Sequence, residues 1–381
     1  MKVFSVELHR VGMPLVRPFQ TSFGTQTARD VLLLRVRTDA GDGWGECVAM
    51  ADPVYSSEYV DGAEAVLRNY LIPAILAAPS VTAASFANTV RFVVGHRMAK
   101  AALETALLDA ELRASATSFA TYFGAVRSRV DCGVSVGIAP TVDALLEEVA
   151  GYVAEGYRRI KLKIKPGWDL EPVAAVRDLL GPVRAETGAT GAVTRGLLQV
   201  DANTAYTAND IEHLGRLDPF DLLLIEQPFV EEDIATHIAL ARAIETPVCL
   251  DESIVDTAVA VDAIERGATS IVNIKAGRVG GYLEAVRIHD ACAQRGVPVW
   301  CGGMLESGVG RAANVALAAM TNFSLPGDTS GSSRYFAEDL TEPFVLRDGQ
   351  LDVPTGPGSG VEVREDLVRE WALRPVETVG R

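Results

Sequence analysis

Short apolar runs alternate with amphipathic stretches through the middle of the chain, and this rhythm predicts a parallel barrel. Most runs follow one another after about 23 to 27 residues, the length of one strand and one helix. The expected strands are Cys132–Val136, Arg159–Ile164, Leu197–Val200, Leu222–Ile225, Val248–Leu250, Ile271–Ile274, Val297–Trp300 and, with a weaker pattern, Asn322–Leu325. Such units over residues 126–325 predict an α/β fold of the (β/α)8 TIM-barrel type. A doubly wound open sheet is the alternative, but its glycine-rich phosphate turn is missing after the first strand.

Residues 1–125 follow another pattern, which predicts an α+β capping domain. Alternating apolar positions indicate three strands, and a polar, aromatic loop is expected at Pro18–Gly24 between the first two. Helical periodicity follows these strands. The tail, residues 326–381, is expected to return to this domain. The expected strands are Lys2–Val11, Val31–Thr38 and Trp44–Ala49, and the expected helices are Val60–Leu76, Ala83–Val93 and Met98–Arg113.

Charge and composition exclude several classes of protein. Lys and Arg number 35 against 50 Asp and Glu, so a net charge of −15 offers no basic surface to nucleic acid. The first ten residues contain Glu7 and no apolar run, unlike a signal peptide. The longest uncharged run, residues 69–90, is broken by Pro73 and Pro79 and does not fit a membrane span. Five widely spaced cysteines without a CxxC pair indicate reduced, buried thiols in a cytoplasmic protein.

Charged residues stand at the C-terminal ends of the expected strands, where barrel enzymes carry their chemistry. Asp201, Glu226 and Asp251 follow one another at intervals of 25 residues, and Lys275 comes 24 residues later. One strand and helix per interval puts all four at the same height of the barrel mouth. Each acid alone could be a helix N-cap, but three unpaired carboxylates together would repel and raise each other's pKa. A hard divalent cation resolves this conflict, so the trio predicts a Mg2+ or Mn2+ site.

Lysines complete the predicted site. Lys161, Lys163 and Lys165 share one face of the second strand, because alternate residues of a strand face the same way. Lys163 and Lys275 come from opposite sides of the mouth and can flank a ligand. A lysine beside a dication and a second lysine has its pKa lowered, so it can act as a base. This arrangement predicts abstraction of a proton next to a carboxylate, with the metal stabilising the enediolate.

The segment Gly133–Gly137 also fits G-x-S-x-G, the nucleophile elbow of α/β-hydrolases, and a serine esterase is a competing hypothesis. That elbow needs a helix directly after the serine, whereas Ser135 lies inside an alternating strand and the helix starts only after Pro140. A non-catalytic protein would leave the charges of the mouth buried without purpose. We interpret Ser135 as a mouth residue that contacts the substrate. The later histidines fall in helical segments away from the strand ends: His213, His237 and His289.

Motifs along nearly the whole chain are shared with a known family: TSFGTQ, GWGECV, HRMAKAALE, CGVSVGI, RIKLKI, LQVDANTAYT, LLIEQP, CLDESI, GRVGGYLEA, PVWCGGM and PGDTS. The chain resembles the enolase superfamily, in its muconate-cycloisomerase-like subgroup. It is most similar there to the o-succinylbenzoate synthase / N-acylamino acid racemase family. The resemblance implies that the three carboxylates bind Mg2+, for which Mn2+ or Co2+ can substitute. It implies Lys163 and Lys275 as opposed acid/base residues, with Lys161 helping to hold the substrate carboxylate.

The resemblance implies two activities on a small-molecule carboxylate. One is the syn-dehydration of 2-succinyl-6-hydroxy-2,4-cyclohexadiene-1-carboxylate to 2-succinylbenzoate, a step toward menaquinone. The other is the racemisation of N-succinyl or other N-acyl amino acids. Muconate cycloisomerase and dipeptide epimerase are the alternatives. Dipeptide epimerases usually carry paired aspartates near the eighth strand, where this chain has Asp328 alone. The family also implies a homo-oligomer, an octamer.

Further residues are expected to contact the substrate or to tune the site. An apolar lid from the capping domain would suit an acyl or cyclohexadiene group, although such residues are equally typical of domain packing. Lys165 stands where the family has an acidic residue, and residues 184–196 form a Gly/Thr-rich insertion longer than the pattern. The lid candidates are Phe19, Phe23, Met50 and Tyr55. The barrel candidates besides Lys161 and Ser135 are Asn203, Gly303 and Met304.

Overall fold

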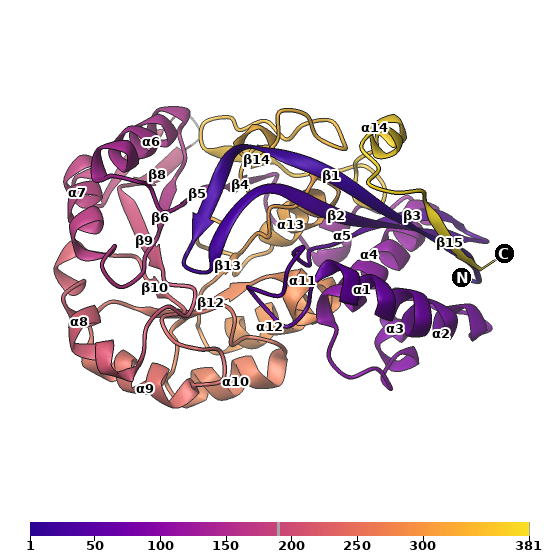
Figure 1. Cartoon of the computed structure of the whole chain (residues 1–381), viewed down its shortest axis with the longest axis horizontal. Helices are drawn as coiled ribbons and strands as arrows, with labels where there is room; N and C mark the ends of the chain where they lie inside the picture. The colour runs from indigo at the N-terminus through magenta and orange to yellow at the C-terminus, as the bar shows by residue number, and fades with distance from the viewer. Residues whose placement is uncertain (189–190, 381) are drawn as a thin grey trace.

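An antiparallel sheet joins the two ends of the chain. In this computed structural model, residues 1–188 and 191–380 are described. The sheet has the order β15-β1-β2-β3. Because Ser5 pairs with Gly380, the two termini lie side by side (Figure 1). The last strand therefore completes the sheet that the first residues begin. The strands are β1 (Val3–Thr21), β2 (Gly24–Thr38), β3 (Gly41–Cys47) and β15 (Glu377–Gly380).

Strands β1 and β2 form one long hairpin, so the loop expected at Pro18–Gly24 is wrong. Phe19 pairs with Gln26 and Thr21 with Gly24, which leaves a tight turn at the tip. The polar composition predicted a loop, but pairing between the two arms keeps both of them extended. The hairpin reaches from the capping helices across to the barrel strands (Figure 1).

Helices α1 to α5 form the rest of the N-terminal region: α1, α2 and α4 pack against this sheet, α3 packs against α4, and α5 packs against α13 of the barrel. A π-helical turn, Leu67–Leu71, joins α1 to α2, so the helix expected at Val60–Leu76 forms as one continuous unit. Helix α3 ends at Thr89 instead of Val93, because Val90 leaves the helical backbone. Helix α4 agrees with its expected bounds within one residue. The helices are α1 (Val60–Val66), α2 (Ile72–Ala77), α3 (Ala83–Thr89), α4 (Arg97–Ala114) and α5 (Phe119–Phe123).

Parallel strands build the barrel wall in the order β13-β12-β11-β10-β9-β6-β5, with helices outside them (Figure 1). This is the α/β barrel that the alternating pattern predicts. The strands are β5 (Gly133–Val136), β6 (Arg159–Lys163), β9 (Leu197–Asp201), β10 (Ile225–Glu226), β11 (Val248–Leu250), β12 (Ile271–Ile274) and β13 (Val299–Cys301). The helices are α6 (Val142–Glu155), α7 (Leu170–Leu180), α8 (Ile211–Gly215), α9 (Ile234–Ala243), α10 (Thr257–Glu265), α11 (Ala276–Val279), α12 (Tyr282–Gln294) and α13 (Gly308–Ala318).

The expected eighth strand, Asn322–Leu325, is replaced by an irregular segment. Phe323 forms a single bridge to Val299 of β13, and Gly327 forms one to Cys132 beside β5. The backbone N–H of Gly133 donates to Gly327 at 2.7 Å. The segment thus occupies the gap between β13 and β5 and closes the barrel. Pro326 lies in it and cannot donate to a ladder, which explains why no regular strand forms.

Shorter elements lie outside the sheet and the barrel wall. The insertion at residues 184–196 carries an antiparallel hairpin, although residues 189 and 190 lie outside the described residues. Strands β4 and β14, from distant parts of the chain, form a small antiparallel pair. Their bounds are β4 (Arg129–Asp131), β14 (Gln350–Asp352), β7 (Arg184–Gly188), β8 (Gly191–Arg195) and α14 (Glu365–Glu370).

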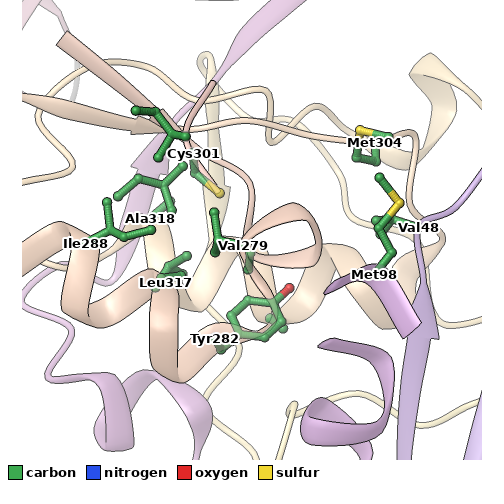
Figure 2. Close-up of a cluster of buried hydrophobic side chains, with 14 of the residues drawn as sticks. Val48, Met98, Val279, Tyr282, Ile288, Cys301, Met304, Leu317 and Ala318 are labelled. Carbon is green, nitrogen blue, oxygen red and sulfur yellow. The ribbon is translucent and has the colours of Figure 1, made fainter. Parts of the chain in front are cut away.

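A continuous hydrophobic core runs from the capping region into the barrel. In Figure 2, Val48 and Met98 of the capping region lie beside Met304 of the barrel. Gly277 of α11 permits this close approach, because a Cβ there would meet Val48 at 2.4 Å. The two regions are therefore packed together along a broad joint rather than tethered.

Two expectations about the whole chain can be compared with the structure. All five cysteines are buried and unpaired, as their spacing predicts. Among the described residues, no helix combines the length and apolar composition that a membrane crossing requires.

Candidate active site

One pocket lies where the β1–β2 hairpin covers the C-terminal ends of the barrel strands. It brings together residues from both regions that are more than 300 positions apart in sequence, such as Phe19 and Asp328. Both predicted acid/base lysines, Lys163 and Lys275, line it. All of the predicted substrate-binding residues line the same pocket: Phe19, Phe23, Met50, Tyr55, Ser135, Lys161, Asn203, Gly303 and Met304.

The register of the barrel strands places the predicted carboxylates beside the lysines. Lys163 is the direct partner of Asp201 on the neighbouring strand, and Asp201 is the partner of Glu226 on the next. Asp251 follows two residues after Cys249, which is the partner of Glu226. Asp201, Glu226 and Asp251 are 0 to 1% exposed. Three carboxylates therefore stand at neighbouring strand ends with almost no access to solvent.

Lys161 is surrounded by carboxylates. Its Nζ lies 2.7 Å from Asp328, 3.1 Å from Glu226 and 3.3 Å from Asp201, and it sits 4.6 Å from the ring centroid of Trp300. Burial lowers the pKa of Lys161, but these carboxylates outweigh burial and raise the pKa above its ordinary value. The side chain is thus held as an ammonium on the floor of the pocket.

Lys163 and Lys275 make separate contacts. Nζ of Lys163 donates to Asp201 at 2.6 Å and to Asn203 at 2.7 Å. Nζ of Lys275 lies 2.7 Å from Asp251 and donates to the Tyr55 hydroxyl at 2.9 Å. The two ammonium groups thus approach the pocket from different strands and different partners.

The structure gives the pKa of Lys275 the opposite direction from the one expected for a lysine beside a dication. Burial lowers the pKa of Lys275, but the negative charge of Asp251 outweighs it, and the pKa stands well above its ordinary value. Burial raises the pKa of Asp201, but Lys163 and Lys161 lower it below its usual range. Burial and the charge of Asp201 raise the pKa of Glu226 well above its ordinary value. Close pairing with carboxylates, which the sequence pattern did not reveal, reverses the direction for Lys275.

The donor set fits a hard divalent cation in its chemistry. Asp251 Oδ1 and Glu252 Oε2 are buried without a hydrogen-bond partner, and such acceptors are rare unless a cation or proton satisfies them. As the side chains stand, the described residues contain no group of three or more His, Cys, Asp or Glu that could hold a metal ion. Each carboxylate of the trio is paired with a lysine instead. Cation binding here therefore requires the three lysines to move away from these carboxylates.

Several charged and polar residues of the site were not predicted. Asp328 accepts from Arg159 at 2.9 Å and from Ser135 at 3.2 Å, in addition to its contact with Lys161. Glu252 accepts from the Asn203 side chain at 3.0 Å. Asp328 was noted only as the single acid of its region. Its place beside Arg159 follows from the irregular segment that closes the barrel, for which the sequence shows little pattern.

Tyr55 differs from its predicted role as an apolar lid residue. Its ring packs 5.6 Å from that of Phe23, as expected for a lid, but its hydroxyl points inward and donates to Asp251 at 3.3 Å. Lys165 also differs, because β6 ends at Lys163 and Lys165 turns back to pair with Trp168. Lys165 therefore does not continue the face of the strand into the pocket.

The hairpin tip is fastened to the barrel mouth. The backbone N–H of Ile138 donates to Gln20 at 2.9 Å, and the Ser22 hydroxyl donates to the carbonyl of Asn203 at 3.2 Å. The free space in the pocket is about 50 Å³, far below the roughly 300–1,000 Å³ of small-molecule binding pockets. A substrate must therefore displace side chains or the hairpin to enter.

Ser135 has surroundings unlike those of an esterase nucleophile. It lies inside β5, and α6 begins only at Val142, so no helix follows the serine directly. Its hydroxyl donates to Asp328, a carboxylate that is already paired with two cations. Ser135 therefore belongs to the lysine and carboxylate network of the pocket.

Comparisons with known proteins agree with this architecture. Residues 4–124 match the family model of the mandelate racemase / muconate lactonizing enzyme N-terminal domain, and residues 144–367 match that of the enolase C-terminal domain-like family. An N-succinylamino acid racemase from an Amycolatopsis species is 62% identical, with 97% of each chain covered. An o-succinylbenzoate synthase from Geobacillus kaustophilus is 44% identical, with 96% of this chain and 95% of the relative covered.

A solved structure shares the whole fold. The crystal structure of an enolase superfamily member from Listeria innocua is 36% identical, with a TM-score of 0.91, and covers 100% of this chain and 99% of its own. The two matching family models together span most of the sequence. The chain therefore belongs to the enolase superfamily, in the family of mandelate racemase and muconate lactonizing enzyme.

Proposed function

We propose that this protein is a Mg2+-dependent enzyme that removes the proton alpha to a carboxylate. It acts as an N-succinylamino acid racemase, an o-succinylbenzoate synthase, or both. The observation that carries the proposal is the presence of Lys163 and Lys275 in one pocket, beside three buried carboxylates. The racemase at 62% identity and the synthase at 44% identity support the two named activities.

The residues divide the work by position. Lys163 takes the α-proton on one face of the substrate, and in racemisation Lys275 returns a proton on the other. In dehydration Lys163 takes the α-proton and then protonates the leaving hydroxide, while Lys275 stays cationic beside the developing charge. Lys161 holds the substrate carboxylate. A divalent cation held by the predicted trio would supply the charge that makes the α-proton acidic.

The protonation states require a rearrangement of the lysines. Lys275 is an ammonium while it contacts Asp251, so it is ready to give a proton rather than to take one. To act as a base, Lys275 must leave that carboxylate and lose its proton. A divalent cation bound to the carboxylate would favour both changes. Lys163 likewise contacts a carboxylate, Asp201, which it must leave in order to reach a substrate. Both lysines can thus exchange protons with a substrate once their ion pairs with the carboxylates have opened.

The surroundings of Asp328 favour an N-acylated substrate over a dipeptide. An epimerase of free dipeptides needs a carboxylate for the substrate ammonium. Both oxygens of Asp328 are engaged by Arg159, Lys161 and Ser135. Burial raises the pKa of Asp328, but Lys161 and Arg159 lower it below its usual range. A carboxylate already neutralised by two cations is a poor receptor for a third.

Parallel assays of the purified enzyme with Mg2+ test the proposal. One follows the optical rotation of each enantiomer of an N-succinyl amino acid, and the other follows the formation of 2-succinylbenzoate by absorbance. We expect turnover of at least one substrate. Turnover of muconate or of a free dipeptide alone would support an alternative within the subgroup instead.

We also propose a cytoplasmic homo-oligomer, with an octamer as the family-based expectation. The exposed Phe92 and Val94, between α3 and α4, support self-association, because large apolar side chains on a surface favour contacts. Light scattering of the purified protein would measure the number of subunits, and a monomeric mass would contradict this proposal.

A further inference from the structure

Arg29 is a buried cation in the pocket that the catalytic scheme does not use. It lies on β2, is 2% exposed, and lines the pocket beside Thr21 and Gln26. Its guanidinium donates to the carbonyl of Val48 at 3.2 Å and, at 3.5 Å, to the Gln26 side chain, while Nε has no partner. A guanidinium carries five N–H donors, so most of its capacity remains unused.

Arg29 differs from the other cations of the pocket in its lack of an ion pair. Lys161, Lys163 and Lys275 each lie within 2.7 Å of a carboxylate oxygen. Among the described residues, no carboxylate lies within 4.0 Å of the Arg29 guanidinium. A buried charge without a counter-charge is costly. This arrangement is therefore a receptor for an anion that the protein itself does not supply.

The two carboxylates that act most strongly on the Arg29 charge have other hydrogen-bond partners. Glu46 accepts from the Ser307 N–H at 3.0 Å, from its hydroxyl at 2.6 Å and from the Gly310 N–H at 3.0 Å, so it caps the start of α13. Glu306 accepts from Asn314 at 2.9 Å. Burial lowers the pKa of Arg29, and the two carboxylates act against this from a distance. The charge of Arg29 remains directed to the pocket.

Resting on the proposed function, we propose that Arg29 binds the terminal carboxylate of the succinyl group, making it a specificity-determining residue. Both proposed substrates are dicarboxylates: one carboxylate lies next to the reacting carbon, and the other ends the succinyl chain. Lys161 lies on the barrel side of the pocket for the first, and Arg29 lies on the capping side for the second. Thr21 and Gln26 add a hydroxyl and an amide beside it. The capping region thus distinguishes acyl groups by charge as well as by apolar fit.

The test compares N-succinyl and N-acetyl forms of the same amino acid, which differ in the second carboxylate. In Arg29→Gln we expect kcat/KM for the N-succinyl substrate to fall roughly 10- to 100-fold, mainly through KM, because a charged hydrogen bond is lost. The N-acetyl substrate should change less than about threefold, since it makes no such contact. Arg29→Lys should recover part of the preference, because lysine keeps the positive charge but lacks the planar N–H donors of the guanidinium.

A buried arginine remote from the pocket provides the matched control. Arg158 is buried and donates to the carbonyl of Asp348, so Arg158→Gln should leave the succinyl-to-acetyl ratio unchanged. An equal fall on both substrates in Arg29→Gln would make Arg29 a structural residue and overturn the proposal. Wild-type kinetics of Arg29→Gln on both substrates would overturn it as well.

Calorimetric binding separates this inference from the proposed reaction. If the wild-type protein binds the N-succinyl compound more tightly than the N-acetyl compound and Arg29→Gln loses that preference, the subsite stands even without turnover. Absence of turnover on every substrate would then contradict the proposed reaction alone. Absence of any binding preference in the wild type would overturn the subsite, whatever the turnover.

Discussion

The two acid/base lysines are held by different parts of the molecule. Lys163 contacts Asp201, the last residue of strand β9, and Asn203, which follows that strand. Lys275 contacts Asp251 of the barrel, but it also donates to Tyr55 and lies 4.9 Å from the centroid of its ring. Tyr55 belongs to the capping region. Lys163 thus makes its hydrogen bonds with barrel residues, while Lys275 also contacts the capping region directly.

The largest effect is expected from the lysines themselves. Lys163→Ala should abolish both reactions, and Lys275→Ala should abolish racemisation and cripple dehydration, with losses of roughly 10³-fold or more. Lys275→Arg keeps a cation but cannot act as a base at neutral pH. We expect it to lose racemisation while retaining α-deuterium exchange with one enantiomer, measured by proton NMR in deuterium oxide.

The retained exchange is the sharpest part of this prediction. Lys163 should still act on its own face of the substrate, so the exchanged enantiomer keeps its configuration. Racemisation by Lys275→Arg at a rate near that of the wild type would contradict the two-base assignment.

Metal removal should affect both faces together, because the carboxylates lie beside both lysines. EDTA should abolish exchange of both enantiomers, and Mg2+, Mn2+ or Co2+ should restore it. Asp251→Asn should lower the affinity for the metal through loss of one charged ligand, so that a higher Mg2+ concentration is needed for the same activity. Full activity in a sample that atomic absorption shows to be metal-free would contradict the predicted trio.

Tyr55→Phe should cause a moderate difference between the α-deuterium exchange rates of the two enantiomers. It removes one hydrogen bond from Lys275, one from Asp251 and none from Lys163, so exchange on the Lys275 face should fall by roughly 5- to 15-fold. Exchange of the opposite enantiomer should fall less, because Lys163 keeps its own contacts. Deuterium incorporation into each enantiomer measures the difference.

Phe23→Ala is the matched control for Tyr55→Phe, because the Phe23 ring packs on Tyr55 but has no hydroxyl that could bond to Lys275. Together with Phe19→Ala it should change which substrates are accepted and leave exchange on at least one of them. An equal loss on both faces in Tyr55→Phe would show that the capping region acts on the pocket as a whole.

The smallest expected effect is on stability, at a contact between the capping region and the barrel that lies outside the pocket. Glu104 of α4 accepts from the Leu283 N–H at 3.1 Å at the start of α12. Burial raises its pKa from 4.5 to about 7. Since the folded state binds this proton more tightly, stability should decrease as pH rises from about 4.5 to 7. Glu104→Gln should remove this loss, gaining on the order of 1–3 kcal/mol relative to wild type between pH 5 and pH 8.

Urea unfolding at the two pH values measures this difference. Asp262→Asn, on the exposed surface of α10, serves as the control and should show no such dependence. A Glu104→Gln variant whose stability relative to wild type is the same at both pH values would show that the joint is insensitive to this charge.

The sequence predicted the barrel side of the site better than the capping side. The residues at the strand ends, such as Asp201 and Lys275, repeat with the length of one strand and helix, so a local pattern placed them at one height. The hairpin at residues 18–24 and the ion pairs of Asp328 depend on contacts between distant segments. No local period marks such contacts, and the polar composition of residues 18–24 predicts a loop there.

Tyr55 shows the same limit within one side chain. An aromatic residue in a candidate lid fits an apolar role, and its neighbour Phe23 supports that interpretation. Only the folded arrangement brings its hydroxyl to Lys275 and Asp251. The chemistry of an amphipathic side chain is decided by which end faces the site.

The fastening of the hairpin tip has a consequence for timing. Gly137 allows the tip to lie close to the barrel mouth, because a Cβ there would meet the carbonyl of Gln20 at 2.9 Å. Because the pocket is narrow, a substrate enters only when side chains or the hairpin move. Each catalytic cycle contains two such movements, one for arrival and one for departure. Their frequency sets an upper bound on the turnover rate, however fast the proton transfers become.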